Sequence, residues 1–319
     1  MAWFLTEDPD EYLATAGGFL TSDVAANTIL LVAADRLRAK DGSRGFISSC
    51  PVPGGPVPGG PVPGGSVAGG SGSGGSGSGG NAPLLGWWRE PGTAIAGAFL
   101  YTPPYPAVLT SMSPDIASAL AECLASRGRP LAGVNADQPA GGAFVNAWQR
   151  RTGDRPRVRV HLRLYRLSGL TAPWPWPTGR ARVAQTADRD LLVAWCAAFR
   201  REESSGPENA APVVDDRLSY GGFTLWETGE GVVSMAGMTR QVAGHVRVAP
   251  VYTPPECRRN GYAADVTFAV SQAALDAGAR DVVLFTDLAN PTSNALYQRL
   301  GYRPVADRVE WSFSPRGPR

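Results

Sequence analysis

One short segment of the sequence, VYTPPECRRNGYAADVTFAV (residues 251–270), combines arginines, a glycine and the start of a helix. The pattern predicts a strand, a turn and an amphipathic helix. A helix N-terminus offers unpaired amide donors and about half a positive charge, which suits a phosphate group. Gly261 lets the backbone approach closely, and Arg258 and Arg259 add cationic donors. The segment therefore predicts a pyrophosphate-binding turn; the alternative is a plain strand-to-helix connection with solvated arginines.

A second polar pattern begins about thirty residues later. The continuous apolar run Val282–Phe285 indicates a strand that is covered on both faces. Asn290 then has the character of a helix N-cap, with Pro291 at the first helical position. Tyr297 lies further along the same predicted helix.

The elements that position these residues follow from the periodicity of the second half, where helices and strands alternate late and strands run together early. This order predicts a mixed sheet. The expected elements are a helix (187–201), a polar loop with a short helix (204–219), three strands (222–227, 231–240, 243–253), a helix (262–277), a strand (281–286), a helix (291–300) and a last strand (305–313).

The two halves of the chain look like copies of one unit. The tetrapeptide Tyr101–Pro104 recurs as Tyr252–Pro255, 151 residues later, and Pro139 and Pro291 open two similar segments 152 residues apart. Two matches in one order at nearly one spacing indicate an internal duplication.

We therefore expect an α/β protein of two tandem domains, each a twisted mixed sheet flanked by helices. PVPGG occurs three times in succession and SGSGG twice, in a stretch that predicts a flexible surface insertion, because a longer loop costs little closure entropy. The expected divisions are a first domain (1–170) with this insertion (48–82), a linker rich in proline and tryptophan (171–179) and a second domain (180–319).

Composition excludes several classes of protein. A net charge of +2 with 43% hydrophobic residues fits neither a disordered polyanion nor a strongly basic nucleic-acid binder. The sequence has no apolar run long enough to span a membrane and no basic leader, so we expect no membrane association and a cytoplasmic location. Four scattered cysteines and two histidines predict neither a disulfide framework nor a metal site.

The two polar patterns resemble a known family. Arg258-x-x-Gly261-x-Ala263 is similar to the acyl-CoA signature of the GNAT superfamily of N-acetyltransferases, which is Gln or Arg, two residues, Gly, one residue, then Gly or Ala. The pattern that runs from Asn290 through Tyr297 resembles the second signature of that superfamily, in the expected order and spacing. VYTPPE followed by FTDLANPTSNALYQRLGY looks like its FR47-like branch.

This resemblance implies an N-acetyltransferase that moves an acetyl group from acetyl-CoA to a primary amine of a small molecule, by direct attack in a ternary complex. In such enzymes the pantetheine arm inserts between two splayed strands and the pyrophosphate lies on the glycine turn. The implied cofactor-binding residues are Val251, Tyr252, Thr253, Arg258, Arg259, Asn260, Gly261, Tyr262, Ala263, Asn290, Asn294 and Tyr297.

The resemblance also implies catalytic roles. The amide of Val251 is the donor for the thioester carbonyl, and Tyr297 is the general acid for the leaving thiolate. Many relatives carry a glutamate on the strand that here reads His245–Ala249, which has no carboxylate. The general base therefore stays open, and its candidates are Glu202, Glu203, Glu227, His245 and a water chain.

The first half lacks the residues of the turn. Tyr101–Pro104 is followed by neither the arginine nor the glycine, and Ser113 predicts an ordinary helix N-cap. We expect a degenerate GNAT-like domain that walls the acceptor pocket. Residues 157–165 alternate between basic and apolar side chains, which predicts a strand with one wet face and one core face.

Two other functions fit parts of the sequence. A domain that binds acyl-CoA without turning it over, as a sensor or scaffold, is consistent with the missing carboxylate. Tandem GNAT-like transferases that use aminoacyl-tRNA lack the turn residues, so Arg258, Gly261 and Ala263 argue against them. The acceptor, the acyl length and the oligomeric state stay open.

Overall fold

The computed structural model of the protein describes residues 2–40, 82–175, 177–203 and 209–315. The expected insertion therefore lies outside the described residues, apart from Ala82. Trp176 of the expected linker lies outside them as well.

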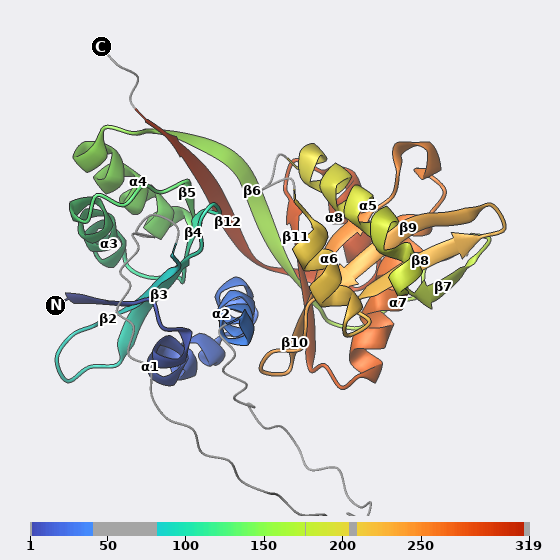
Figure 1. The fold of residues 1–319 in the computed structure, drawn as a ribbon, viewed down its shortest axis with the longest axis horizontal. Coiled ribbons are helices and arrows are strands. Elements are labelled where there is room, and N and C mark those ends of the chain that lie inside the picture. The colour runs from blue at the N-terminus through green and yellow to red at the C-terminus, as the bar shows by residue number, and fades with distance from the viewer. Residues whose placement is uncertain (1, 41–81, 176, 204–208, 316–319) are drawn as a thin grey trace, which may run out of the picture.

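The two halves repeat one order of elements (Figure 1). The first half comprises β1 (Ala2–Thr6), α1 (Pro9–Ser22), α2 (Thr28–Lys40), β2 (Leu84–Arg89), β3 (Ile95–Tyr101), β4 (Ala107–Leu109), α3 (Pro114–Ser126), β5 (Gly133–Ala136), α4 (Gln138–Thr152) and β6 (Arg155–Leu167). The second half comprises β7 (Arg180–Val183), η1 (Thr186–Asp188), α5 (Arg189–Glu202), α6 (Ala211–Leu218), β8 (Phe223–Thr228), β9 (Gly231–Met238), β10 (His245–Tyr252), η2 (Pro255–Cys257), α7 (Tyr262–Asp276), β11 (Asp281–Asp287), α8 (Pro291–Arg299) and β12 (Tyr302–Ser314). The helices and strands predicted for the second half all lie at or within a few residues of these bounds.

The repeat correspondence differs from the sequence prediction at one of its two matches. Pro139 and Pro291 both lie in the first turn of the helix that precedes the last strand, α4 and α8, so these positions are equivalent. Tyr101, however, ends β3, whereas Tyr252 ends β10, which is the counterpart of β4. The shared tetrapeptide therefore does not mark equivalent positions, and the order of elements carries the duplication instead.

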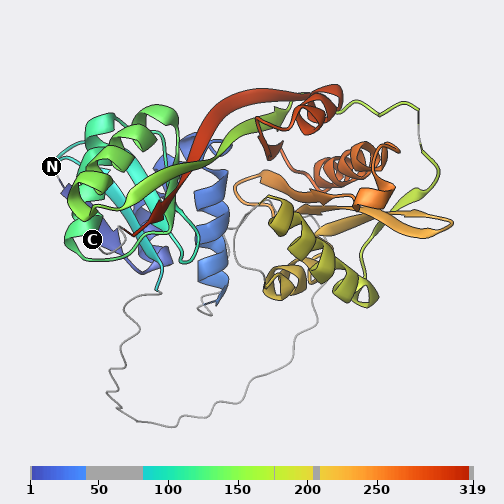
Figure 2. The same ribbon diagram turned by 90° about the horizontal axis from the view of Figure 1, so that it is seen from above.

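All described strands form one twelve-stranded mixed sheet, in the order β1-β2-β3-β4-β5-β12-β6-β11-β10-β9-β8-β7. The two last strands are exchanged: β6 of the first half pairs with β11 of the second, and β12 of the second half pairs with β5 of the first. β6 and β12 also pair with each other along their length, and they run side by side from one half to the other (Figure 2). Each half therefore completes the sheet of the other.

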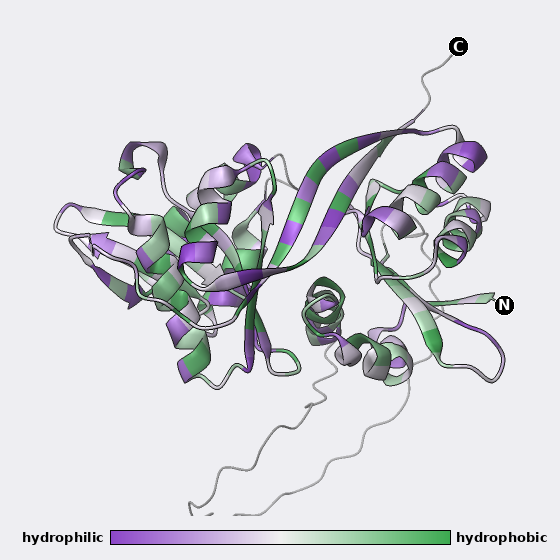
Figure 3. Cartoon of the chain, turned by 180° about the vertical axis from the view of Figure 1, so that it is seen from behind, coloured by the Kyte–Doolittle hydropathy of each residue, from purple (hydrophilic) through white to green (hydrophobic). Residues whose placement is uncertain are grey.

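Helices cover both faces of the sheet in each half. In the second half, α7 and α8 pack on one face, around Val266, Val270 and Leu300, and α5 and α6 pack on the other, around Leu192 and Val214. Figure 3 colours the ribbon by hydropathy and shows hydrophobic and hydrophilic stretches alternating along these helices. Val282 and Leu284 of β11 are buried, as the continuous apolar run predicted. No helix among the residues that the structure describes is long and apolar enough to cross a membrane.

The alternation predicted for residues 157–165 holds at Arg157, His161 and Leu164 but fails at Val158 and Tyr165. Val158 is 46% exposed, whereas Tyr165 is completely buried. The reason is that β6 crosses between the halves. Among the described strands, its first residues pair with β12 alone, whereas its last residues lie between β12 and β11 in the sheet of the second half.

Candidate active site

β10 and β11 separate at the point where the predicted site lies. They pair in parallel only from His245 opposite Asp281 to Arg247 opposite Val283. Beyond this point, among the described strands, β10 pairs only with β9 and β11 pairs only with β6. The β10–β9 register shifts between Val248 and Val251, which is a bulge next to Pro250. The result is a notch between two strands, whose edges present main-chain groups that an extended ligand can use.

The turn after β10 opens directly onto the start of α7. Gly261 has φ +89° and Arg259 has φ +67°, so both adopt the left-handed conformation that favours glycine. The N-terminus of α7 has no side-chain cap, unlike that of α8 or α3. A Cβ at Gly261 would lie in ordinary van der Waals contact with Asp265 Oδ2, at 3.7 Å, and with Pro177, at 3.9 Å, so a small side chain would meet no clash there. The strand, turn and helix start therefore lie where the sequence predicted them.

The two arginines of this turn behave differently. Arg258 folds back: its Nε donates to the Thr253 carbonyl at 2.9 Å, and Nη2 donates to both carboxylate oxygens of Glu202 at 2.7 and 2.8 Å. Arg258 therefore ties the turn to the end of β10 and to α5. Arg259 is exposed, and the amide of Asn260 donates to the carbonyls of Cys257 and Arg258.

Sequence reasoning missed an acidic residue in the first turn of α7. Asp265 is 1% exposed, and neither carboxylate oxygen has a hydrogen-bond partner among the described residues. Its Oδ2 lies 3.7 Å from the position that a Cβ at Gly261 would take. Burial raises the pKa of this carboxyl to about 6. A negative charge there opposes an anion at the helix start, whereas the protonated form does not.

The two asparagines predicted at α8 both form hydrogen bonds within the fold. Asn290 accepts from the Ser293 amide at 3.0 Å, which confirms the predicted N-cap. Asn294 donates to the carbonyl of Asp287 at 2.8 Å and accepts from the Tyr165 hydroxyl at 2.9 Å. Asn294 thus fastens α8 to β11 and β6, while Nδ2 of Asn290 keeps a free donor among the described residues.

Tyr297 and Glu203 lie close enough to influence each other. Tyr297 is 8% exposed, and burial together with the charge of Glu203 raises its pKa. Its hydroxyl has no hydrogen-bond partner among the residues described. Burial and the charge of Asp287 raise the pKa of Glu203 as well, against the opposing effect of Arg159. Tyr297 on α8 therefore keeps its proton, and the exposed Glu203 at the end of α5 is near enough for its charge to act on that phenol.

The other candidate bases are engaged or distant. Both oxygens of Glu202 accept from the turn arginine. Glu227, on β8, pairs with Arg182 at 3.1 Å. His245 begins β10, roughly 20 Å from Val251 at about 3.3 Å per residue, and its Nε2 lies 3.1 Å from an Asp281 oxygen. Glu227 and His245 each lie beside an oppositely charged side chain, and their role as the general base stays a prediction.

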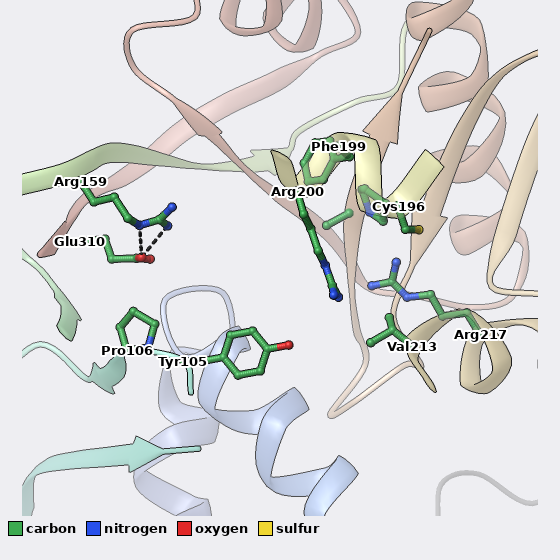
Figure 4. A pocket seen from close by; sticks show the side chains of 11 residues that line it. Tyr105, Pro106, Arg159, Cys196, Phe199, Arg200, Val213, Arg217 and Glu310 are labelled. Atoms are coloured by element: carbon green, nitrogen blue, oxygen red, sulfur yellow. Dashed lines mark hydrogen bonds and ion pairs between the residues drawn. The ribbon is translucent and has the colours of Figure 1, made fainter. Parts of the chain in front are cut away.

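A pocket of about 250 Å³ adjoins the notch at the junction of the two halves (Figure 4). Ala249 and Pro250 immediately precede Val251, and Arg159 donates to the Glu203 carbonyl at 3.1 Å. Because both halves contribute, no local sequence pattern could have indicated this pocket. Its lining residues are Tyr105, Pro106, Arg159, Cys196, Phe199, Arg200, Val213, Arg217, Ala249, Pro250 and Glu310.

The corresponding place in the first half is closed. Arg308 of β12 is buried and donates to the carbonyls of Leu109 on β4 and Asn135 on β5, at 2.7 and 2.8 Å. Its Nε also donates to Oδ1 of Asn135 at 2.7 Å. The guanidinium therefore bridges the two strands, and the side chain of Ser113 caps the helix that follows. Among the described residues, no group of histidine, cysteine, aspartate and glutamate could hold a metal ion.

Comparison with known proteins supports this description of the second half. Residues 170–302 match the model of the Acetyltransferase (GNAT) family. A GCN5-related N-acetyltransferase from Kribbella flavida is similar in structure, with TM-score 0.51 and 22% identity over 70% of this chain and 89% of that one. A GCN5-related N-acetyltransferase from Sphaerobacter thermophilus gives TM-score 0.53 and 16% identity over 74% and 82% of the two chains. No curated protein matches the chain.

These likenesses establish the fold. The second half has the GNAT fold, within a large mixed sheet flanked by helices. The FR47-like branch and the degenerate character of the first half stay predictions.

Proposed function

We propose that the protein is an N-acetyltransferase that transfers an acetyl group from acetyl-CoA to a primary amine of a small molecule. One observation carries the proposal: β10 and β11 separate beyond Arg247 and Val283, beside an uncapped helix start, within the segment that matches the acetyltransferase family. The notch and the helix start together offer what a thioester carrier with a diphosphate requires.

The residues present fit this cofactor. The exposed turn at Arg258–Gly261 and the start of α7 suit the pyrophosphate, and the side of Val251 and Tyr252 that does not pair with β11 suits the pantetheine arm. Arg259 and the free amide of Asn290 supply further donors. Arg258 acts by shaping the turn through Thr253 rather than by reaching the diphosphate. When bound, acetyl-CoA supplies the acetyl group as an activated thioester.

Two proton transfers are then assigned to residues of this chain: one from the attacking ammonium and one to the departing thiolate. Glu203 takes a proton from the attacking ammonium, and its raised pKa brings it nearer the value that suits a base at neutral pH. Tyr297 holds the proton for the departing thiolate, and the amide of Val251 donates to the oxygen on which charge develops.

The transfer is direct, without an acyl-enzyme. Cys257 is the cysteine nearest the turn, and burial raises the pKa of its thiol, so the reactive thiolate is disfavoured. The pocket beside Pro250 then receives the acceptor, and the first half walls it with Tyr105 and Pro106. A degenerate first half and a cytoplasmic location remain part of this proposal.

Release of free CoA thiol across a panel of small amines tests the function. We expect amine-dependent release from acetyl-CoA and no release without an amine. Tight CoA binding with no amine-dependent release from any member of the panel would contradict the transferase and favour the alternative, an acyl-CoA-binding sensor.

A further inference from the structure

Arg217 is a buried cation at the inner wall of the pocket. Only 7% of the residue is exposed, and its Nη1 is buried without a hydrogen-bond partner in the described structure. The guanidinium lies 5.4 Å from the centroid of the Phe223 ring, and Nη1 packs against Gly237. Burial lowers the pKa of this arginine, but a guanidinium keeps its proton near neutral pH.

The carboxylates around Arg217 belong to other cations. Asp216 is its neighbour in sequence, but its oxygens lie 3.2 Å from Arg240 and 3.9 Å from Arg36. The carboxylate of Glu310, across the pocket, pairs with Arg159. These pairs leave the Arg217 guanidinium without a salt bridge in the part of the chain that the structure describes, and the favourable charge of Asp216 is outweighed by burial.

An arginine in this position is costly for the fold. A buried charge without a salt-bridge partner destabilises the folded state, and an apolar side chain of similar size is often more stable there. Residues that cost stability in this way cluster at functional sites, where a ligand supplies the missing partner. The pocket provides the space for that ligand.

We propose that Arg217 binds an oxyanion of the acceptor, so that the substrate is a small amine that also carries a carboxylate or a phosphate. This inference rests on the proposed transferase function. Arg200 and the hydroxyl of Tyr105 point into the same space, one from each half of the chain (Figure 4). Two guanidinium groups and a phenol are the donors that carboxylates and phosphates prefer. The volume of about 250 Å³ accommodates a compact acceptor.

Thermal unfolding tests the binding without any turnover. For Arg217→Met we expect an unchanged or higher melting temperature without ligand, because an unpaired buried charge is removed. Millimolar small amino carboxylates, or aminoalkyl phosphonates, should stabilise the wild type and leave this variant unaffected. Arg247→Met is the control, since Arg247 is a half-buried arginine whose Nε is buried without a partner among the described residues and which does not line the pocket.

Two results would overturn the proposal. One is a melting temperature several degrees lower for Arg217→Met, with the stabilisation by anionic amines retained, because that is the behaviour of a structural arginine. The other is the absence of stabilisation by any anionic amine in the wild type. The carboxylate and phosphonate series distinguish the two sources of the oxyanion.

Kinetics separates this proposal from the transferase function itself. We compare two amines that are identical except that one carries a carboxylate and the other its carboxamide. For the wild type, kcat/KM should be at least 10-fold higher with the carboxylate. Arg217→Met should remove this difference while still acetylating the carboxamide. If both amines are acetylated with equal kcat/KM, the oxyanion site is contradicted and the transferase function is not. If no amine is acetylated, the transferase function is contradicted. The melting-temperature experiment still tests whether Arg217 binds an anionic amine.

Discussion

The side chains that carry the proposed chemistry differ in how far the sequence could reveal them. Tyr297, Gly261 and Val251 occur at the spacing of two signatures, and local structure placed them as predicted. Glu203 could be separated from the other candidate bases only by the fold, which shows which carboxylates are engaged by arginine. Arg217 left no signal in the sequence, since the pocket around it is lined by β6, α5, α6, β10, β12 and the loop between β3 and β4.

Tyr297→Phe tests the acid. If the phenol supplies the proton to the thiolate, turnover falls by roughly 100-fold, with little change in CoA affinity. Tyr302→Phe is the control, because Tyr302 is a buried tyrosine whose ring centroid lies 6.1 Å from that of Tyr297 and whose hydroxyl bonds Ser271. Steady-state kinetics with CoA titration measures both variants. Wild-type turnover in Tyr297→Phe removes the proposed role.

Asp265 predicts a pH-dependent stability. Its folded pKa of about 6 lies above the ordinary value of 3.8, so the wild type loses stability as the pH rises from about 4 to about 6. Asp265→Asn removes this loss. We expect equal melting temperatures near pH 4 and a variant that is several degrees more stable above pH 6. A constant difference across this range would show that the carboxyl is not titrating.

The positions of the helices and strands along the chain could be predicted from periodicity. Which strands pair with each other could not. The sequence indicates β6 and β12 as strands; it does not indicate that they change places. The reason is physical: register and partner depend on which edge is free, and that edge is created by residues more than a hundred positions away. The same dependence explains why Val158 is exposed and Tyr165 is buried.

Substitution of Arg308 tests whether this side chain holds β4 and β5 of the first half together. Arg308→Leu removes three hydrogen bonds and leaves buried carbonyls of β4 and β5 unsatisfied, which we expect to cost about 3–5 kcal/mol of unfolding free energy. Arg303→Leu is the control, an exposed arginine on the same strand. Urea unfolding measures both. Equal stability of the two variants contradicts a structural role for Arg308.

For the molecule as a whole, the exchange of last strands makes the two halves one structure. β12 pairs with β5 in the first half and with β6 in the second. The ion pair between Arg163 of β6 and Asp307 of β12, at 2.7 Å, joins β6 to β12. The division at the proline-rich linker therefore describes the chain rather than two independent cores. The acceptor pocket depends on this union, because both halves line it.

Removal of β12 tests this interdependence. A chain that ends after Leu300 should lose cooperative unfolding in both halves, since β5 and β6 each lose a partner. Circular dichroism with thermal melting measures the effect. A truncated chain that still binds CoA and melts in one sharp transition would show that the second half folds without the exchanged strand.

Calorimetric titration with CoA is the decisive measurement for the cofactor site. Gly261→Asp places a side chain and a charge at the start of α7, whereas Gly278→Asp places the same change at the other end of that helix, at a similar φ of +86° and with open space around it. We predict that the wild type and Gly278→Asp bind CoA alike and that Gly261→Asp binds at least about 100-fold more weakly, or about 2.7 kcal/mol. Wild-type affinity in Gly261→Asp would contradict the site.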